Sequence, residues 1–181
     1  MPCMIKYIKS LLVGKTTEST PLTPEKENWF RIRAKQAEQG DSFAQAELGM
    51  WYESGHGVPQ DYSQAMKWYH EAAEQGECLA QIKLGEWYEK QQYHQIAAEW
   101  YHKAAEQQNT YSKVKLGEMY ERGLGVLQHY AEAHMWYNIA AIDNGVGAIT
   151  KRDFLAAKMT AGQIEEAQRM AKAWMDKYTV K

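Results

Sequence analysis

The sequence predicts an all-α fold, an α/α superhelix (solenoid) of antiparallel helix pairs. Two residue clusters, which alternate along the chain, indicate this fold. The first, Leu-Gly-x-x-Tyr, begins at Leu48, Leu84 and Leu116. The second, Ala-x-x-Trp-Tyr-x-x-Ala-Ala, begins at Ala65, Ala97 and Ala133. The distance from Leu48 to Leu84 is 36 residues and from Leu84 to Leu116 is 32 residues, within the range of about 20–50 residues that is typical of solenoid repeats.

The spacing of apolar residues and of capping residues gives the expected elements in order. A helix over about 24–39, capped by Thr23 and ended by Gly40, has the pattern of a second helix whose first helix is missing. Ile32, 17 residues before Gly49, is expected at the position that the tryptophan occupies in the later second helices. The helix pairs that follow are expected over about 42–54 and 61–75, 78–90 and 93–107, and 111–122 and 129–143. Degenerate helices over about 148–158 and 161–177 close the chain. Asp61 and Thr160 are expected to cap helices.

This pattern predicts three segments, the second of which is subdivided. Residues 1–22 are a leader and linker, and residues 23–145 are the solenoid, with an N-terminal half unit over 24–40. Three full repeats follow over about 41–76, 77–108 and 109–145, and residues 146–181 form C-terminal capping helices. In the second repeat Gln91 and Gln92 join the helices, and the hinge glycines that occupy 55 and 57 in the first repeat are absent.

The recurring residues are expected to hold the fold together. Gly49, Gly85 and Gly117 remove a side chain where, we predict, a neighbouring helix comes close, because glycine inside a helix otherwise costs about 1 kcal/mol relative to alanine. The tryptophans of the second cluster are predicted to pack in the core rather than to form a ligand platform.

Composition excludes several classes of function. The net charge of −2 gives no general attraction to nucleic acid or to an anionic membrane. No apolar run approaches the roughly 20 residues of a membrane span. The leader has apolar residues at helical spacing, which fits a packing segment or, less well, a membrane anchor. Its apolar block is too short for a secretory signal.

The two cysteines, Cys3 and Cys78, form no regular disulfide pattern. The sequence therefore predicts a cytoplasmic protein; it leaves the oligomeric state open.

The full motif, L-G-x-x-Y-x-x-G-x-G-V-x-x-D-Y-x-x-A-x-x-W-Y-x-x-A-A, resembles the Sel-one-like repeat, a branch of the tetratricopeptide-like α-solenoids. The resemblance covers residues 44–145 as three repeats, and flanking helices extend it over about 24–177. It implies a right-handed superhelix whose concave face is lined by the first helices. It also implies an adaptor role, since most members hold partner proteins or peptides. The protein is also expected to be bacterial.

The resemblance places a partner-binding face on the non-structural residues of the first helices. These residues form four rows, with one member from each repeat. The rows are Phe43, Leu79 and Tyr111; Glu47, Lys83 and Lys115; Met50, Glu86 and Glu118; and Glu53, Glu89 and Glu121. An extended peptide could lie across them, with basic side chains near the glutamates. Alternatively, the glutamate row is a solvated surface without a binding role.

No catalytic or metal-binding constellation is found in the sequence. The six histidines include no i, i+4 pair, and His129 and His134 are five residues apart. Cys78 has no histidine beside it in sequence, so a nucleophilic role would need one in space. The leading hypothesis is therefore a non-enzymatic protein-binding module without a cofactor. An immunity protein that neutralises a bacterial toxin is the alternative. An enzyme of the kind suggested for secreted, cysteine-rich relatives is weaker, because their cysteine pairs are absent.

Overall fold

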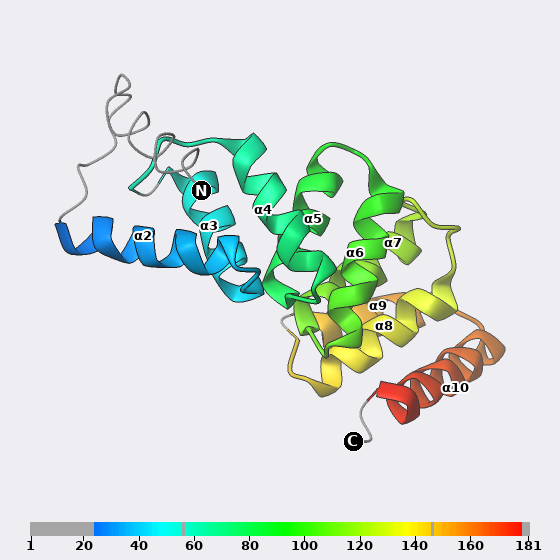
Figure 1. The fold of residues 1–181 in the computed structure, drawn as a ribbon. Helices are drawn as coiled ribbons and strands as arrows, with labels where there is room; N and C mark the ends of the chain where they lie inside the picture. Colours follow the sequence, from blue (N-terminus) through cyan, green and yellow to red (C-terminus); the bar gives the residue numbers. More distant parts are fainter. Residues whose placement is uncertain (1–23, 56, 146, 179–181) are drawn as a thin grey trace. The chain divides into compact units, whose positions relative to one another are not determined.

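The computed structural model of the protein describes residues 24–55, 57–145 and 147–178 (Figure 1). Within these ranges the regular elements are all α-helices, which confirms the predicted fold class. They are α2 (Pro24–Glu38), α3 (Ser42–Ser54), α4 (Tyr62–Glu74), α5 (Cys78–Lys90), α6 (His94–Glu106), α7 (Thr110–Arg122), α8 (Tyr130–Ile142), α9 (Ala148–Ala156) and α10 (Ala161–Tyr178). The predicted leader over 1–22 and the predicted Thr23 cap lie outside the described residues.

The helices belong to two compact units. Unit 1 extends to Ala80 and contains α2, α3 and α4, whereas unit 2 begins at Gln81, within α5, and contains the later helices. In unit 1, α3 packs against both α2 and α4. In unit 2, α7 packs against α6 and α8, and α8 in turn packs against α9 and α10 (Figure 1). The two helices at the C-terminal end therefore cover α8.

Side-chain caps explain where several helices begin. Asp61 accepts hydrogen bonds from the backbone N–H groups of Ser63 (2.9 Å) and Gln64 (3.0 Å) and so caps α4, as predicted. At the matching position of the third repeat, His129 Nδ1 accepts from the N–H of Glu132 at 3.1 Å. Thr160 and Gln163 each accept a hydrogen bond from the other's backbone N–H at the start of α10, which is the capping box that the sequence predicts.

The turns between the helices of a pair differ as the sequence suggests. Gly55 and Gly123 end α3 and α7 in the left-handed conformation, with φ of 67° and 68°, which glycine adopts without steric cost. The second repeat has no glycine there. Gln92 takes the left-handed conformation instead, with φ of 65°, and its N–H bonds to the carbonyl of Glu89 at 2.9 Å.

The three helical glycines lie where the neighbouring second helix comes close, as predicted, and a side chain of that helix makes the approach. A Cβ on Gly49 would lie 2.5 Å from the ring of Tyr69, and one on Gly85 would lie 2.6 Å from the ring of Tyr101. Tyr137 lies equally close to Gly117. In each repeat the space that glycine leaves is therefore filled by a tyrosine ring of the second helix, and not by a helix backbone.

The tryptophans of the second cluster, Trp68, Trp100 and Trp136, are buried, which confirms their assignment to the core.

The register expected for α2 is different from the one observed. Ile32 is at the position that aligns with these tryptophans, yet it is 46% exposed, while Phe30 is only 6% exposed. Phe30 stacks on Trp51 with ring centroids 5.4 Å apart. Because residues two apart lie about 200° apart around a helix, burying Phe30 turns Ile32 outward.

Candidate partner-binding surface

The first-helix residues predicted to bind a partner have different surroundings in the two units. In unit 1, Phe43 and Met50 are exposed on α3. Glu47, which lies between them on the same helix face, forms an ion pair with Arg33 of α2, with Nε and Oε2 2.7 Å apart. Arg33 therefore joins α2 to the predicted face, a contribution that the pattern of repeats did not indicate.

In unit 2 the predicted charged residues of the first helices form ion pairs. Lys115 of α7 pairs with Glu89 of α5 at 3.0 Å and lies 3.9 Å from Glu118. Glu118 pairs in turn with Lys151 of α9 at 3.0 Å, and Lys83 lies 3.8 Å from Glu86. The charges on this face are thus largely balanced by one another. Sequence reasoning missed Lys151, although it is at the position of α9 that matches Lys115.

Glutamates of the acidic row accept hydrogen bonds from the buried tyrosines. Tyr69 Oη donates to Glu53 Oε2 at 2.7 Å, Tyr101 Oη to Glu89 Oε2 at 2.8 Å, and Tyr137 Oη to Glu121 Oε2 at 2.8 Å. The row therefore stabilises each helix pair, whatever else it does. A signal for this was present in the sequence, because both the glutamate and the tyrosine recur in all three repeats.

The remaining predicted residues are Leu79, which is half-buried, and Tyr111, which is exposed on α7. The Tyr111 ring lies 6.3 Å from that of Tyr101. Burial and a hydrogen bond to Glu86 raise the pKa of Tyr111. Glu86 and Tyr111, from different rows and different repeats, are thus brought together by the fold.

The tyrosine–glutamate pairs make the protein sensitive to alkaline pH. Burial, followed by the hydrogen bond to glutamate, raises the pKa of Tyr101 and of Tyr137 above the usual value near 10. Burial and a hydrogen bond to Glu132 raise the pKa of Tyr120 to about 12. Below pH 10 the phenols are protonated in both the folded and unfolded states. Above it the unfolded chain loses protons that the folded protein retains, so stability falls as pH rises.

We therefore expect the free energy of unfolding in urea to fall between about pH 9 and about pH 11. The variant Tyr137→Phe is expected to be less stable at the lower pH, because Glu121 loses its donor, and to lose less stability on raising the pH. An identical loss in the two proteins would contradict the prediction.

A polar rung, formed by a first-helix residue and the residue just after the second helix, recurs in each repeat. Gln75 Nε2 donates to Gln45 Oε1 at 2.7 Å, and Gln107 Nε2 donates to Gln81 Oε1 at 2.8 Å. In the third repeat Lys113 pairs with Asp143, with Nζ and Oδ2 2.6 Å apart. The side chain of Lys113 is completely buried. Sequence reasoning missed this rung, because the two residues of each pair are 26 or 30 positions apart.

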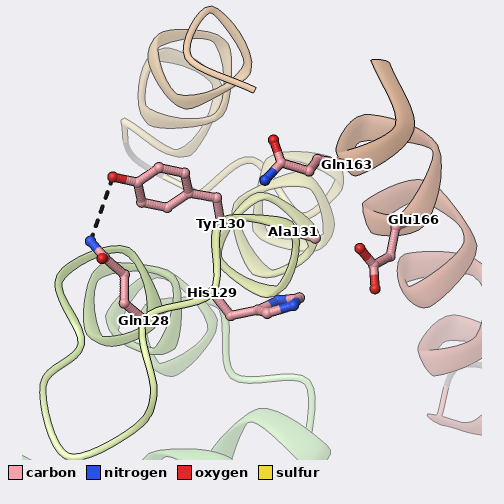
Figure 2. Close-up of a pocket in the computed structure, with 6 residues that line it drawn as sticks. All are labelled: Gln128, His129, Tyr130, Ala131, Gln163 and Glu166. Atoms are coloured by element: carbon pink, nitrogen blue, oxygen red, sulfur yellow. Dashed lines mark hydrogen bonds between the residues drawn. The ribbon is translucent and has the colours of Figure 1, made fainter. Parts of the chain in front are cut away.

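Two hollows on the surface are small or polar. One of about 230 Å³ lies between the start of α8 and α10, and Figure 2 shows His129 and Glu166 extending toward it from these two sides. This volume is below the roughly 300–1,000 Å³ of ligand pockets. The other, about 570 Å³, is lined by polar residues around Gly40 at the turn between α2 and α3. Ligand pockets are mostly apolar, so neither hollow indicates a small-molecule site.

The described residues contain no group of three or more histidine, cysteine, aspartate or glutamate side chains that could hold a metal ion. Burial raises the pKa of the Cys78 thiol and Glu77 raises it further, which disfavours the reactive thiolate. In the part of the chain that the structure describes, no helix has both the length and the apolar composition needed to span a membrane.

Comparisons with known proteins identify relatives of this chain. The family model described as Sel1 repeat matches residues 42–77, 78–109 and 110–145. A crystal structure of a Sel1 repeat protein from Oxalobacter formigenes is 31% identical in sequence, with a TM-score of 0.64, and the similarity covers 68% of this chain and 96% of that one.

A second crystal structure is that of c5321, described as a protective antigen present in uropathogenic Escherichia coli strains and displaying an SLR fold. It is 29% identical, with a TM-score of 0.49, and the similarity covers 82% of this chain but only 41% of the length of c5321. No curated protein matches the chain.

Proposed function

The chain belongs to the Sel1 repeat family, and we therefore propose that it is a non-enzymatic module that binds a partner protein or peptide. Members of this family generally serve as protein-interaction modules. We propose that the partner lies along the first helices, α3, α5 and α7, in the concave groove that these helices line in the family's superhelix. The partner-binding residues would be the four rows identified from the sequence.

One observation carries the proposal. Most of the apolar and aromatic residues that recur in all three repeats, such as Trp136, Tyr137 and Leu116, are buried. The residues of the three predicted rows that vary between copies are instead wholly or partly exposed, from Phe43 in unit 1 to Glu118 in unit 2. Recurring residues that hold the fold together and variable residues that remain accessible are what a binding module requires, because they allow specificity to change without loss of the fold.

The proposal can be tested by capturing partners on the immobilised full chain and then measuring the affinity of the purified partner. A variant with Lys83→Ala, Glu86→Ala and Tyr111→Ala changes only the first-helix face of unit 2. A matched control with Lys67→Ala, Glu74→Ala and Glu99→Ala changes exposed residues of second helices. We expect the first variant to weaken binding and the control to bind normally. Equal affinities of the two variants would place the binding surface elsewhere.

The acidic row needs a separate variant because its carboxylates accept structural hydrogen bonds. Combining Glu53→Gln, Glu89→Gln and Glu121→Gln removes three charges but keeps an acceptor oxygen for each tyrosine. If basic side chains of the partner contact this row, the variant will bind more weakly and its affinity will depend less on salt. An unchanged affinity and salt dependence would restrict the row to its structural role.

The same measurement distinguishes an adaptor from a toxin inhibitor. An inhibitor is expected to bind one partner with a dissociation constant near about 1 nM, as tight protein–inhibitor complexes do. An adaptor is expected to bind several partners more weakly. Capture of a single, tightly bound protein whose toxicity this chain suppresses would favour the inhibitor.

A further inference from the structure

We propose that the partner is anchored in unit 1 by an uncharged segment that carries an aromatic side chain. The anchor would bind an apolar patch formed by Trp29 of α2 and by Phe43 and Met50 of α3, which we name the unit 1 patch. This inference rests on the proposed function and adds to it where the binding energy arises and what chemistry the partner must present.

The patch exposes large apolar side chains of both α2 and α3. Trp29 and Phe43 are each 51% exposed, and Met50 is 40% exposed. Phe43 and Met50 are seven residues apart on α3, so they lie on one helix face. Large aromatic side chains that remain exposed together are typical of binding surfaces, and a few such residues usually supply most of the binding energy.

Arg33 joins the aromatic side chains and holds them in place. Its guanidinium carbon lies 4.3 Å from the centroid of the Trp29 ring and 5.6 Å from that of Phe43. The guanidinium is fixed in turn by Glu47, 2.7 Å from its Nε, and by Gln36, whose Oε1 accepts from Nη1 at 3.2 Å. The rings are therefore ordered before a partner arrives, which lowers the entropic cost of binding.

The charges around the patch favour an uncharged partner segment. Arg33 and Glu47 carry opposite charges, and the atoms that join them are shielded from solvent. They therefore neutralise each other at the centre of the patch. Glu53, three residues after Met50, lies at its edge, where it accepts a hydrogen bond from Tyr69. An aromatic side chain, by contrast, would gain from removing the rings of Trp29 and Phe43 from water.

Unit 2 keeps an exposed aromatic residue, Tyr111, at the position of Phe43, but it differs at the position of Met50. Where α3 has Met50, the equivalent residues are Glu86 and Glu118, which lie 3.8 Å from Lys83 and 3.0 Å from Lys151 respectively. Covering such exposed ion pairs with an apolar side chain removes their hydration and gains little. The apolar anchor is therefore expected in unit 1.

The test uses a phage-displayed library of random peptides of about 12 residues, selected on the immobilised full chain. We expect the selected peptides to be enriched in tryptophan, phenylalanine or tyrosine and to have little net charge. Their affinity should change less than about twofold between about 0.05 and 0.5 M salt. Phe43→Ala and Trp29→Ala should each weaken binding about tenfold. Tyr93→Ala, which removes an aromatic residue of unit 2 that is 59% exposed, is the matched control and should have no effect.

Several outcomes would overturn the inference. They are selection of charged peptides, a steep salt dependence, or equal losses in Tyr93→Ala and Phe43→Ala. Circular dichroism of each variant excludes unfolding as the cause of a loss. The proposed function fails separately, if neither a cellular partner nor any peptide binds the first-helix face. A partner that binds unit 2 and tolerates Phe43→Ala would leave the proposed function standing and refute the anchor.

Discussion

Replacing Asp143 by alanine is expected to destabilise the protein by about 3–5 kcal/mol, because it leaves the buried charge of Lys113 without a counterion. The Lys113 side chain has no exposed surface, and its Nζ contacts Asp143 at 2.6 Å and Gln108 Oε1 at 2.8 Å. Its ammonium group also lies 4.8 Å from the centre of the Trp174 ring. Without Asp143, one amide oxygen and one ring face would have to compensate a charge that water cannot reach.

Asp143 lies at the C-terminal end of α8, where the helix dipole disfavours a negative charge. Its presence there is explained by Lys113. The double variant Lys113→Gln with Asp143→Gln converts this rung into the glutamine pair that the first and second repeats contain. We expect the double variant to recover stability to within about 1–2 kcal/mol of the native protein, since a neutral hydrogen-bonded pair needs no counterion.

Urea unfolding followed by circular dichroism measures both free energies. The double variant should be more stable than Asp143→Ala, although it carries one more substitution. If it is less stable, or if Asp143→Ala unfolds like the native protein, the buried ion pair does not have the role assigned to it.

Replacing Trp136 by alanine is expected to cost about 3–5 kcal/mol, as deletion of a large core side chain does. Trp136 is buried in the main cluster of unit 2, together with residues of α6, α7 and α10. Its ring lies 5.2 Å from that of His102 in α6 and 5.5 Å from that of Trp174 in α10. Alanine would therefore leave a cavity bordered by three helices, which cannot all move inward together.

Trp29→Ala is the matched control for this prediction, because it makes the same substitution at a half-exposed side chain. We expect it to cost less than about 1 kcal/mol. The conservative variant Trp136→Phe should cost less than Trp136→Ala, because the phenyl ring fills part of the cavity. Equal free energies of unfolding for Trp29→Ala and Trp136→Ala would contradict the assignment of Trp136 to the core.

Much of the fold could be predicted because helix formation in a repeat protein depends on local, periodic information. The bounds predicted for the first helices of the first and second repeats, 42–54 and 78–90, are those observed. Asp61 and the Thr160–Gln163 pair cap helices as predicted, because a cap is made by residues within three positions of each other. The failed register of α2 had no complete repeat to guide it, so the packing of Phe30 on Trp51 decided its orientation.

The candidate surface was predicted only in outline. Repetition separated buried residues such as Trp136 from variable first-helix residues such as Phe43, and this separation followed from sequence alone. The side chains that these first-helix residues contact could not be predicted in the same way. Glu53 accepts a hydrogen bond from a tyrosine 16 residues away, and Lys115 pairs with a glutamate of the preceding repeat. The first contact recurs in every repeat, so the repeats carried a signal for it. The second depends on which side chains meet between successive repeats, and the repeat pattern does not encode that.

The sequence by itself determined that this protein is an all-α solenoid of helix pairs, because a periodic pattern of small and apolar residues can bury its surface only by stacking one pair on the next. Only the tertiary structure decided that a buried tyrosine, and not a helix backbone, fills the space at Gly49, that a charge at Lys113 replaces a glutamine rung, and that Arg33 orders two exposed aromatic rings beside Glu47. Each of these contacts joins side chains of different helices, whose meeting is fixed by packing in three dimensions.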